Sequence, residues 1–243
     1  MINFIKEKSI SALKWSEQYT KTDMIYLAKG GFWLSMNQGI SSICALILSI
    51  AFANLLPKES FGIYKYVLSA FSILTISSLN GIFTSFNRSV SNGREGNLRE
   101  GLTTQIKWSL IGSGLAIIIS LYYFLNHNQT LFFCFLIVAV FLPIFSNFNI
   151  YNHLLQGRKN FRLSAIFGIT EQIFGLIVTI LSILFTKNPI IIVLSYFASY
   201  SLLRVFLLFK ITKKYPTNKE KDPEMVSYGK HLTVIRIIGD IYK

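Results

Sequence analysis

The chain has 243 residues, of which 52% are hydrophobic and 14% are charged, and its formal net charge is +13. Soluble domains have roughly 25% charged residues, so this composition excludes an ordinary soluble protein. The basic residues lie in short loops between long apolar runs and not on one soluble surface, which argues against nucleic acid as the reason for the charge.

Residues 1–29 mix apolar and charged positions ahead of the first apolar run. Charges recur from Lys6 to Lys29, and no apolar core followed by a small-residue cleavage site is present, so the pattern is not that of a cleavable signal peptide. Two interpretations fit this segment: a helix lying on the cytoplasmic surface of the membrane, or a loosely ordered tail.

Six apolar stretches follow, each long enough for a bilayer core of roughly 30 Å, which needs about 20 helical residues. They are residues 32–56, 63–86, 108–125, 131–150, 163–185 and 190–209. They are apolar nearly all round and lack the alternation of β-barrel strands. A seventh run begins at residue 232 and is cut short at Lys243.

The sequence therefore predicts an all-α, polytopic membrane helix bundle. Its expected parts are a six-helix transmembrane lobe over residues 30–211, a cytoplasmic linker over residues 212–231 and the truncated start of a seventh helix over residues 232–243.

Lys and Arg are concentrated in the N-terminal tail and in the second, fourth and sixth loops, whereas the first, third and fifth loops contain only Lys58 and Lys187. Because basic loops stay in the cytoplasm, we expect a cytoplasmic N-terminus. The outer loops are short, so the helices that they join should be antiparallel neighbours. No soluble domain fits between the helices, which places the function inside or across the bilayer.

Two charged residues fall inside the fifth and sixth apolar stretches, where each costs roughly 2.5–3.5 kcal/mol on insertion scales. Glu171 and Arg204 are equally far in sequence from the turn near Lys187. They should therefore lie at one depth on adjacent helices and form an ion pair. Either a structural link between two helices or the charged wall of a water-filled cavity would explain the pair.

The seventh run carries Arg236 and Asp240, which share a helix face because they are four residues apart. Asp240 is expected at a depth similar to that of Glu171, so the four charges are candidates for one polar cavity; a local pair within the helix is the alternative. Asn37, near the start of the first stretch, is a candidate for the same cavity or for a hydrogen bond between helices.

Motifs of catalysis are missing from the sequence. No P-loop, GxSxG or HExxH occurs, and the three histidines and two cysteines show no metal-ligand spacing. Glu59 is the single acid of the outer loops, where a membrane glycosyltransferase would need several. We therefore expect a protein that is not an enzyme and that needs no cofactor or metal.

Four short segments resemble Wzx-type polysaccharide flippases of the multidrug/oligosaccharidyl-lipid/polysaccharide exporter superfamily. They are residues 30–34 (GGFWL), 53–64 (ANLLPKESFGIY), 155–161 (LQGRKNF) and 227–230 (SYGK). Their order and spacing along the six-span pattern make the resemblance fairly specific.

The resemblance implies a transporter with two six-helix lobes around a central cavity in the bacterial inner membrane, of which this chain supplies the N-terminal lobe and is inactive alone. The implied substrate is an undecaprenyl-diphosphate-linked oligosaccharide, moved to the outer leaflet for O-antigen, other lipopolysaccharide or capsule synthesis. The implied partners are this substrate, membrane lipids, a coupling cation (H⁺ or Na⁺) and other polysaccharide assembly proteins, with no nucleic acid.

Site residues follow from the same resemblance. Arg88, Arg204 and Arg236 are candidates for phosphate contact, since Arg binds phosphate bidentately. Glu171 and Asp240 are candidates for cation coupling. Two rival functions stay open: a drug/cation antiporter of the same superfamily, although the first span lacks a coupling acid, and a polymerase or scaffold of polysaccharide assembly, although no long outer loop exists.

Overall fold

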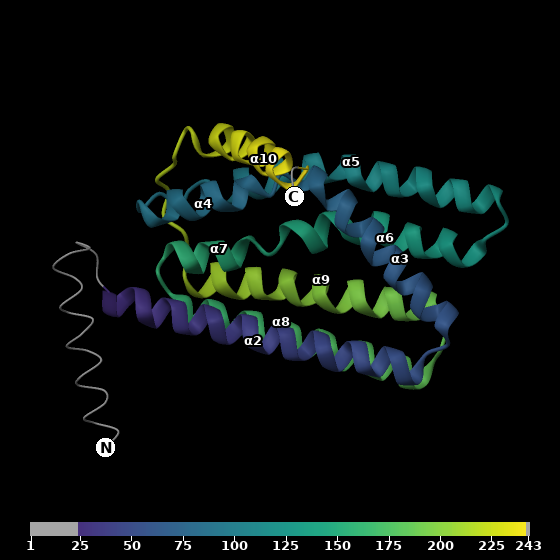
Figure 1. The fold of residues 1–243 in the computed structure, drawn as a ribbon. Coiled ribbons are helices and arrows are strands. Elements are labelled where there is room, and N and C mark those ends of the chain that lie inside the picture. The colour runs from purple at the N-terminus through teal and green to yellow at the C-terminus, as the bar shows by residue number, and fades with distance from the viewer. Residues whose placement is uncertain (1–23, 242–243) are drawn as a thin grey trace, which may run out of the picture.

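The computed structural model describes the backbone of residues 24–241 and the side chains of residues 29–239. This part of the chain is helical and contains no strand. The elements are α2 (Met24–Leu55), α3 (Lys58–Leu74), the 3-10 helix η1 (Thr75–Ser78), α4 (Gly81–Ser91), α5 (Leu98–Leu125), α6 (Gln129–Asn147), α7 (Ile150–Gly157), α8 (Phe161–Phe185), α9 (Pro189–Lys214) and α10 (Met225–Ile241) (Figure 1). The predicted surface helix within residues 1–29 lies almost wholly outside the described residues.

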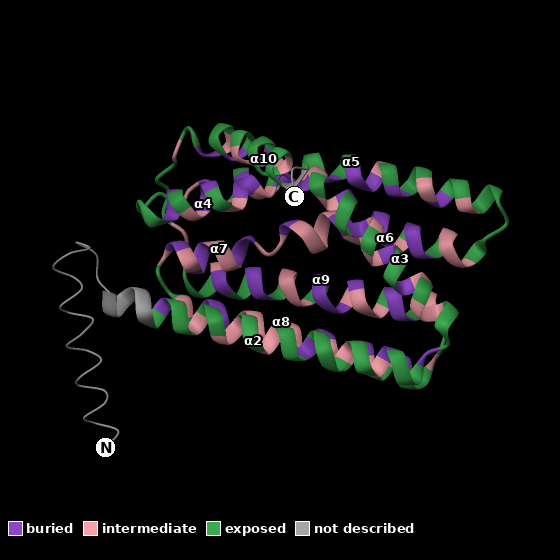
Figure 2. Cartoon of the chain, in the orientation of Figure 1, coloured by how far each residue is buried: buried purple, intermediate pink, exposed green. Residues whose placement is uncertain are grey.

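The predicted all-α bundle with six membrane-spanning helices is confirmed. Six helical segments in the described chain are long and apolar enough to cross a membrane. Large apolar side chains also point outward, among them Phe32, Leu125 and Phe185. Exposed residues accordingly run along the outer faces of α2 and α5 (Figure 2). Such a surface is stable when lipid covers it, because helices satisfy their own backbone hydrogen bonds.

The long helices pack as neighbouring pairs. α2 lies against α8, α8 against α9, α9 against α6, and α6 against α5, while α3 crosses α6 and α9 (Figure 1). The predicted antiparallel neighbours α5–α6 and α8–α9 are thus confirmed, whereas α2 makes far more contact with α8 than with α3. The loops of residues 92–97, 158–160 and 215–224 meet at one end of the bundle, which we call the basic end.

The second span differs from the prediction. A continuous helix was expected over residues 63–86, but the helix begins at Lys58, tightens into η1 and stops at Leu79, and α4 then begins at Gly81. Leu79 has a φ of 51°, in the left-handed region that ends helices. The Thr75 and Ser77 hydroxyls donate to the carbonyls of Ser72 and Leu74. Hydrogen bonds from Ser and Thr hydroxyls to nearby carbonyls compete with the regular hydrogen bonds of a helix. A hydropathy profile does not reveal this competition.

The fourth span is broken as well. One run over residues 131–150 was expected, but α6 ends at Asn147 and α7 begins at Ile150. Pro143 lies inside α6, where it removes a backbone donor from the last turns of the helix. Ser78, before the first break, donates a hydrogen bond of 3.1 Å to Ser146, before the second. The two breaks are therefore side by side.

The apolar core is divided at the level of these breaks. One buried cluster includes Phe71, Leu142 and Phe197, and the other includes Leu79, Ile150 and Leu207. Along α9, Arg204 separates the residues of the first cluster from those of the second. The same holds for the break in each interrupted span. The core thus consists of two apolar halves with a polar layer between them.

The last helix begins at Met225, earlier than the predicted residue 232, and lies mainly against α4 (Figure 1). Two glycines allow this close crossing. A Cβ at Gly81 would lie 2.4 Å from the Gly229 carbonyl oxygen, and one at Gly229 would lie 2.8 Å from the Ile82 Cα. The Gly81 amide also donates to Thr233 Oγ1 at 3.0 Å.

Candidate functional site

A layer of polar side chains lies between the two apolar halves of the core. We call this layer the polar belt; its members are Ser78, Ser109, Ser146, Asn147, Glu171 and Arg204. Asn147 donates to Ser109 Oγ at 2.9 Å, which links α6 to α5. The belt therefore connects the helices of both broken spans at the level of their interruptions.

The predicted ion pair between Glu171 and Arg204 is confirmed and lies at the centre of this belt. Arg204 donates to Glu171 Oε1 from Nη2 at 2.5 Å and from Nε at 2.7 Å. The Glu171 and Arg204 side chains are 5% and 13% exposed. A charged pair this deep needs further partners to offset its desolvation.

Those partners come from the broken fourth span. The Tyr151 hydroxyl in the first turn of α7 donates to Glu171 Oε2 at 2.7 Å. Arg204 Nη1 donates to the carbonyl oxygen of Phe145, in the last turn of α6. Carbonyls in a last turn lack a partner further along the helix, so the guanidinium satisfies a group that the break exposes. The pair therefore joins α8 and α9 to both sides of the α6–α7 interruption.

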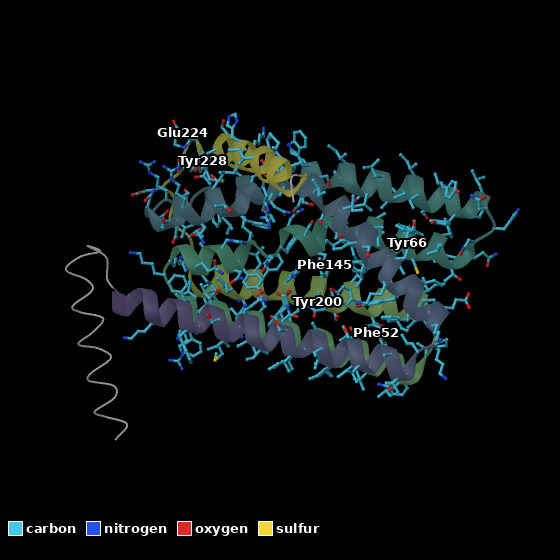
Figure 3. The ribbon with its side chains drawn as sticks, viewed as in Figure 1. Phe52, Tyr66, Phe145, Tyr200, Glu224 and Tyr228 are labelled. Atoms are coloured by element: carbon cyan, nitrogen blue, oxygen red, sulfur yellow. The ribbon has the colours of Figure 1, made fainter. Side chains whose placement is uncertain are left out.

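An aromatic cluster lies beside the pair. The Arg204 guanidinium is 4.2 Å from the centre of the Phe145 ring and 5.9 Å from that of Tyr200. Phe145 and Tyr200 lie near each other on α6 and α9, in the middle of the bundle (Figure 3). Cation–π contacts add to the electrostatic support of the buried guanidinium.

A cavity of about 180 Å³ lies beside this cluster. It is lined from α2, α3, α8 and α9, and its polar lining residues are Ser49, Tyr64, Lys65, Gln172, Tyr196 and Tyr200. Tyr200 donates to Gln172 Oε1 at 3.3 Å. Glu171 and Arg204 do not line the cavity. The site is therefore a tyrosine-rich pocket beside a buried ion pair that does not face the pocket.

Asn37 lies close to this level on α2. A Cβ at Gly168 of α8 would be 2.8 Å from Asn37 Oδ1, so the amide packs onto the glycine one turn before Glu171. Asn37 Oδ1 is buried and has no hydrogen-bond partner among the described residues. The structure thus brings three of the six predicted site residues to neighbouring places.

Arg88 and Arg236 lie elsewhere. Arg88 is on α4 at the basic end, with its guanidinium 4.9 Å from the ring centre of Tyr228. With Asn87, His153 and Gln156 it lines a polar cavity of about 520 Å³. Arg236 is an exposed residue of α10, which packs on α4 and α5, and the side chain of Asp240 lies outside the described residues. Of the four charges expected around one cavity, the described side chains bring Glu171 and Arg204 together, and Arg236 lies on a helix that packs on other neighbours.

The basic end contains a polar cluster that the sequence did not reveal. We call it the linker clasp and define it by Glu95, Asn97, Arg158, Asn218 and Asp222. Arg158 donates to both carboxylate oxygens of Glu95 at 2.6 Å and also to the carbonyls of Tyr215 and Pro216.

The clasp also holds the linker through its backbone. The backbone N–H of Asn218 donates to Glu95 Oε2 at 3.2 Å, and the backbone N–H of Asp222 donates to Asn97 Oδ1 at 2.6 Å. The hydrogen bonds of the Arg158 guanidinium lower the pKa of the Glu95 carboxyl. The bonded residues of the clasp are 57 to 125 positions apart in the chain, so a local pattern does not predict their contacts. The arrangement fixes the segment between α9 and α10 to the loops of the bundle.

A comparison of the sequence with models of known protein families finds one match. The model of the family described as "Polysaccharide biosynthesis protein" matches residues 27–243. No curated protein and no solved structure gives a significant match. The match covers every described transmembrane helix except the first residues of α2.

Proposed function

The chain belongs to the polysaccharide biosynthesis protein family, and from this premise we propose that it transports lipid-linked oligosaccharide across the bacterial cytoplasmic membrane. The substrate is an undecaprenyl-diphosphate-linked unit that moves from the inner to the outer leaflet for O-antigen, lipopolysaccharide or capsule synthesis. The family match over a bundle of six membrane-spanning helices is the observation that carries the proposal.

The physical problem agrees with this scaffold. A diphosphate sugar headgroup is too strongly hydrated to cross hydrocarbon alone. Two helical lobes that rock around a polar cavity shelter it while the prenyl chain stays in lipid. In this proposal the described helices supply one lobe, the basic end faces the cytoplasm, and an H⁺ or Na⁺ gradient drives the cycle. The protein itself makes or breaks no covalent bond.

Arg88 is the best candidate for the first contact with the diphosphate. Its guanidinium is exposed and lines the polar cavity at the basic end. Arg204 is less suitable, since its Nε and Nη2 are bonded to Glu171 and its Nη1 to Phe145. The Arg88 guanidinium therefore has more N–H groups left to donate to a phosphate than the Arg204 guanidinium has. Glu171 is likewise paired, so coupling through it requires the pair to open.

The experiment depletes the protein in its own bacterium and measures the surface polysaccharide and the tolerance of toxic cations. We expect the polysaccharide to fall while tolerance stays unchanged. Unchanged polysaccharide together with a loss of tolerance would contradict the proposal and favour a drug/cation antiporter. Complementation with Arg88→Gln should restore less polysaccharide than complementation with Arg99→Gln, which alters another exposed arginine at the basic end.

A further inference from the structure

A basic cleft at the start of α2 is used neither by the polar belt nor by the Arg88 cavity. Its volume is about 210 Å³, and it lies between the first turns of α2 and the turn from α7 to α8. Lys29 and Trp33 line it from α2, and Lys159, Asn160 and Arg162 line it from the other side. We call it the headgroup cleft.

Close packing of two distant segments forms the cleft. A Cβ at Gly30 would lie 2.8 Å from the Phe161 ring, so the backbone of α2 rests directly on the start of α8. Lys159 turns the chain with a φ of 62°, and the Asn160 side chain accepts from the Leu163 amide at the helix start. The walls of the cleft are therefore fixed by backbone packing and by a helix cap.

The described lining of the cleft is basic. None of its lining residues is acidic, and the Arg162 guanidinium lies 5.6 Å from the centre of the Trp33 ring. Within the described residues, Lys29 and Arg162 form no salt bridge, whereas Arg158 and Arg204 each bind a glutamate. Lys29 and Arg162 on opposite walls of one small cleft favour an anionic ligand.

The place of the cleft indicates where that anion comes from. Phe32, next to Trp33, is 63% exposed. Further along α2 and α8 from the cleft, Ile43 and Ile173 are also exposed apolar residues. Trp and basic residues at the end of an apolar helix belong to the level of the lipid headgroups. Basic pockets between transmembrane helices at this level bind phosphate headgroups.

We propose that the headgroup cleft binds the phosphate of a lipid whose chains lie along the outer faces of α2 and α8. Arg162 and Lys29 contact the phosphate, and Trp33 holds the guanidinium toward it. A membrane phospholipid such as phosphatidylglycerol and a polyprenyl diphosphate offer the same phosphate chemistry. Binding does not depend on transport, so the proposal can fail or hold independently of the proposed function.

The test is native mass spectrometry of the full chain released from detergent, with phosphatidylglycerol, phosphatidylcholine or undecaprenyl diphosphate added in turn. One basic residue near a charged headgroup contributes enough for about a fivefold change in binding. We expect Arg162→Gln to weaken the anionic adducts by about fivefold, and Arg162→Lys to restore most of the loss. Arg99→Gln is the matched control, because Arg99 is the second residue of α5 as Arg162 is of α8.

Each lipid arm has a defined meaning. Loss of the phosphatidylglycerol adduct in Arg162→Gln assigns the cleft to membrane phospholipid, and loss of the diphosphate adduct assigns it to a polyprenyl carrier; either supports phosphate binding. Unchanged adducts in both arms, or phosphatidylcholine adducts as strong as those of phosphatidylglycerol, would overturn the proposal. Equal melting temperatures of the two arginine variants would show that Arg162→Gln remains folded.

Discussion

The buried pair of Glu171 and Arg204 is best explained as a link that closes a gap in the bundle. Bringing two charges out of water costs several kcal/mol per ion, and their attraction repays this only when the remaining hydrogen-bond groups are satisfied. Tyr151 and the Phe145 carbonyl satisfy them here, and both come from the edges of the α6–α7 break. The structural interpretation of the pair therefore has direct support.

Arg204→Met tests this link at the level of one residue. The substitution leaves the Glu171 carboxylate without its cation and should destabilise the protein by about 3–5 kcal/mol. Unfolding in detergent micelles measures the change, with Lys213→Met, an exposed position of α9, as the control. The double variant Glu171→Leu/Arg204→Met should be less destabilised than Arg204→Met alone. A double variant with the summed loss of both single variants would contradict the link.

Glu95 gives the protein a pH-dependent contact at the basic end. Its pKa is lowered because the Arg158 guanidinium stabilises the carboxylate. A lowered folded-state pKa contributes stability that is complete above the unfolded value, about 4.3, and is lost as the pH falls through the folded value.

Glu95→Gln should therefore lower the melting temperature most at neutral pH. The difference from the original protein is expected to shrink as the pH drops below about 4.3, where Glu95 of the unfolded chain becomes protonated, and through the lower pKa of folded Glu95. Glu59→Gln, at an exposed position of α3, is the control. A difference that stays constant from neutral pH to pH 3 would show that the contact does not depend on the Glu95 charge.

Two helices of the bundle are interrupted at one level, and this is the main feature at the scale of elements. Interrupted membrane helices occur where backbone groups gain other partners or line a cavity. Asn147 and Arg204 provide such partners here, because their side chains donate to the carbonyl oxygens of Pro143 and Phe145. On the side of the two breaks that faces the basic end, the short helix α4 consequently packs against both α7 and α10.

The crossing of α4 and α10 depends on glycine at Gly81. Gly81→Ala places a methyl group 2.4 Å from the Gly229 carbonyl oxygen, so we expect a loss of about 1–3 kcal/mol. Gly114→Ala meets no atom within 4 Å and should be neutral or stabilising by about 1 kcal/mol or less. Thermal unfolding of the two variants measures the contrast. Equal effects would mean that the close crossing does not exist.

Hydropathy predicted the six long apolar helices, and sequence distance predicted the Glu171–Arg204 contact, because both depend on position along regular helices. The breaks were missed because Leu79 and Asn149 interrupt runs that stay apolar on either side. The clasp between Glu95 and Asn218 was missed because contacts across such distances depend on how the loops fold together. The packing of α10, which carries Arg236, on α4 and α5 was not predicted, because depth along a helix does not say which neighbour that helix contacts.

At the scale of the whole molecule, orientation is the first property to test. Single cysteines introduced at His127 and at Lys219 in a background without Cys44 and Cys134 report the two ends of the bundle. In intact cells a membrane-impermeant maleimide should label His127→Cys and should label Lys219→Cys only after permeabilisation. Labelling of Lys219→Cys in intact cells would invert the proposed orientation.

Transport of a lipid-linked oligosaccharide is the central claim, and the leaflet position of that lipid measures it most directly. In cells depleted of the protein, the sugar unit on its polyprenyl diphosphate should accumulate where only reagents admitted to the cytoplasm reach it. Re-expression should return the unit to the outer leaflet. Accumulation of unpolymerised units on the outer leaflet during depletion would contradict transport and assign the protein to a later step of polysaccharide assembly.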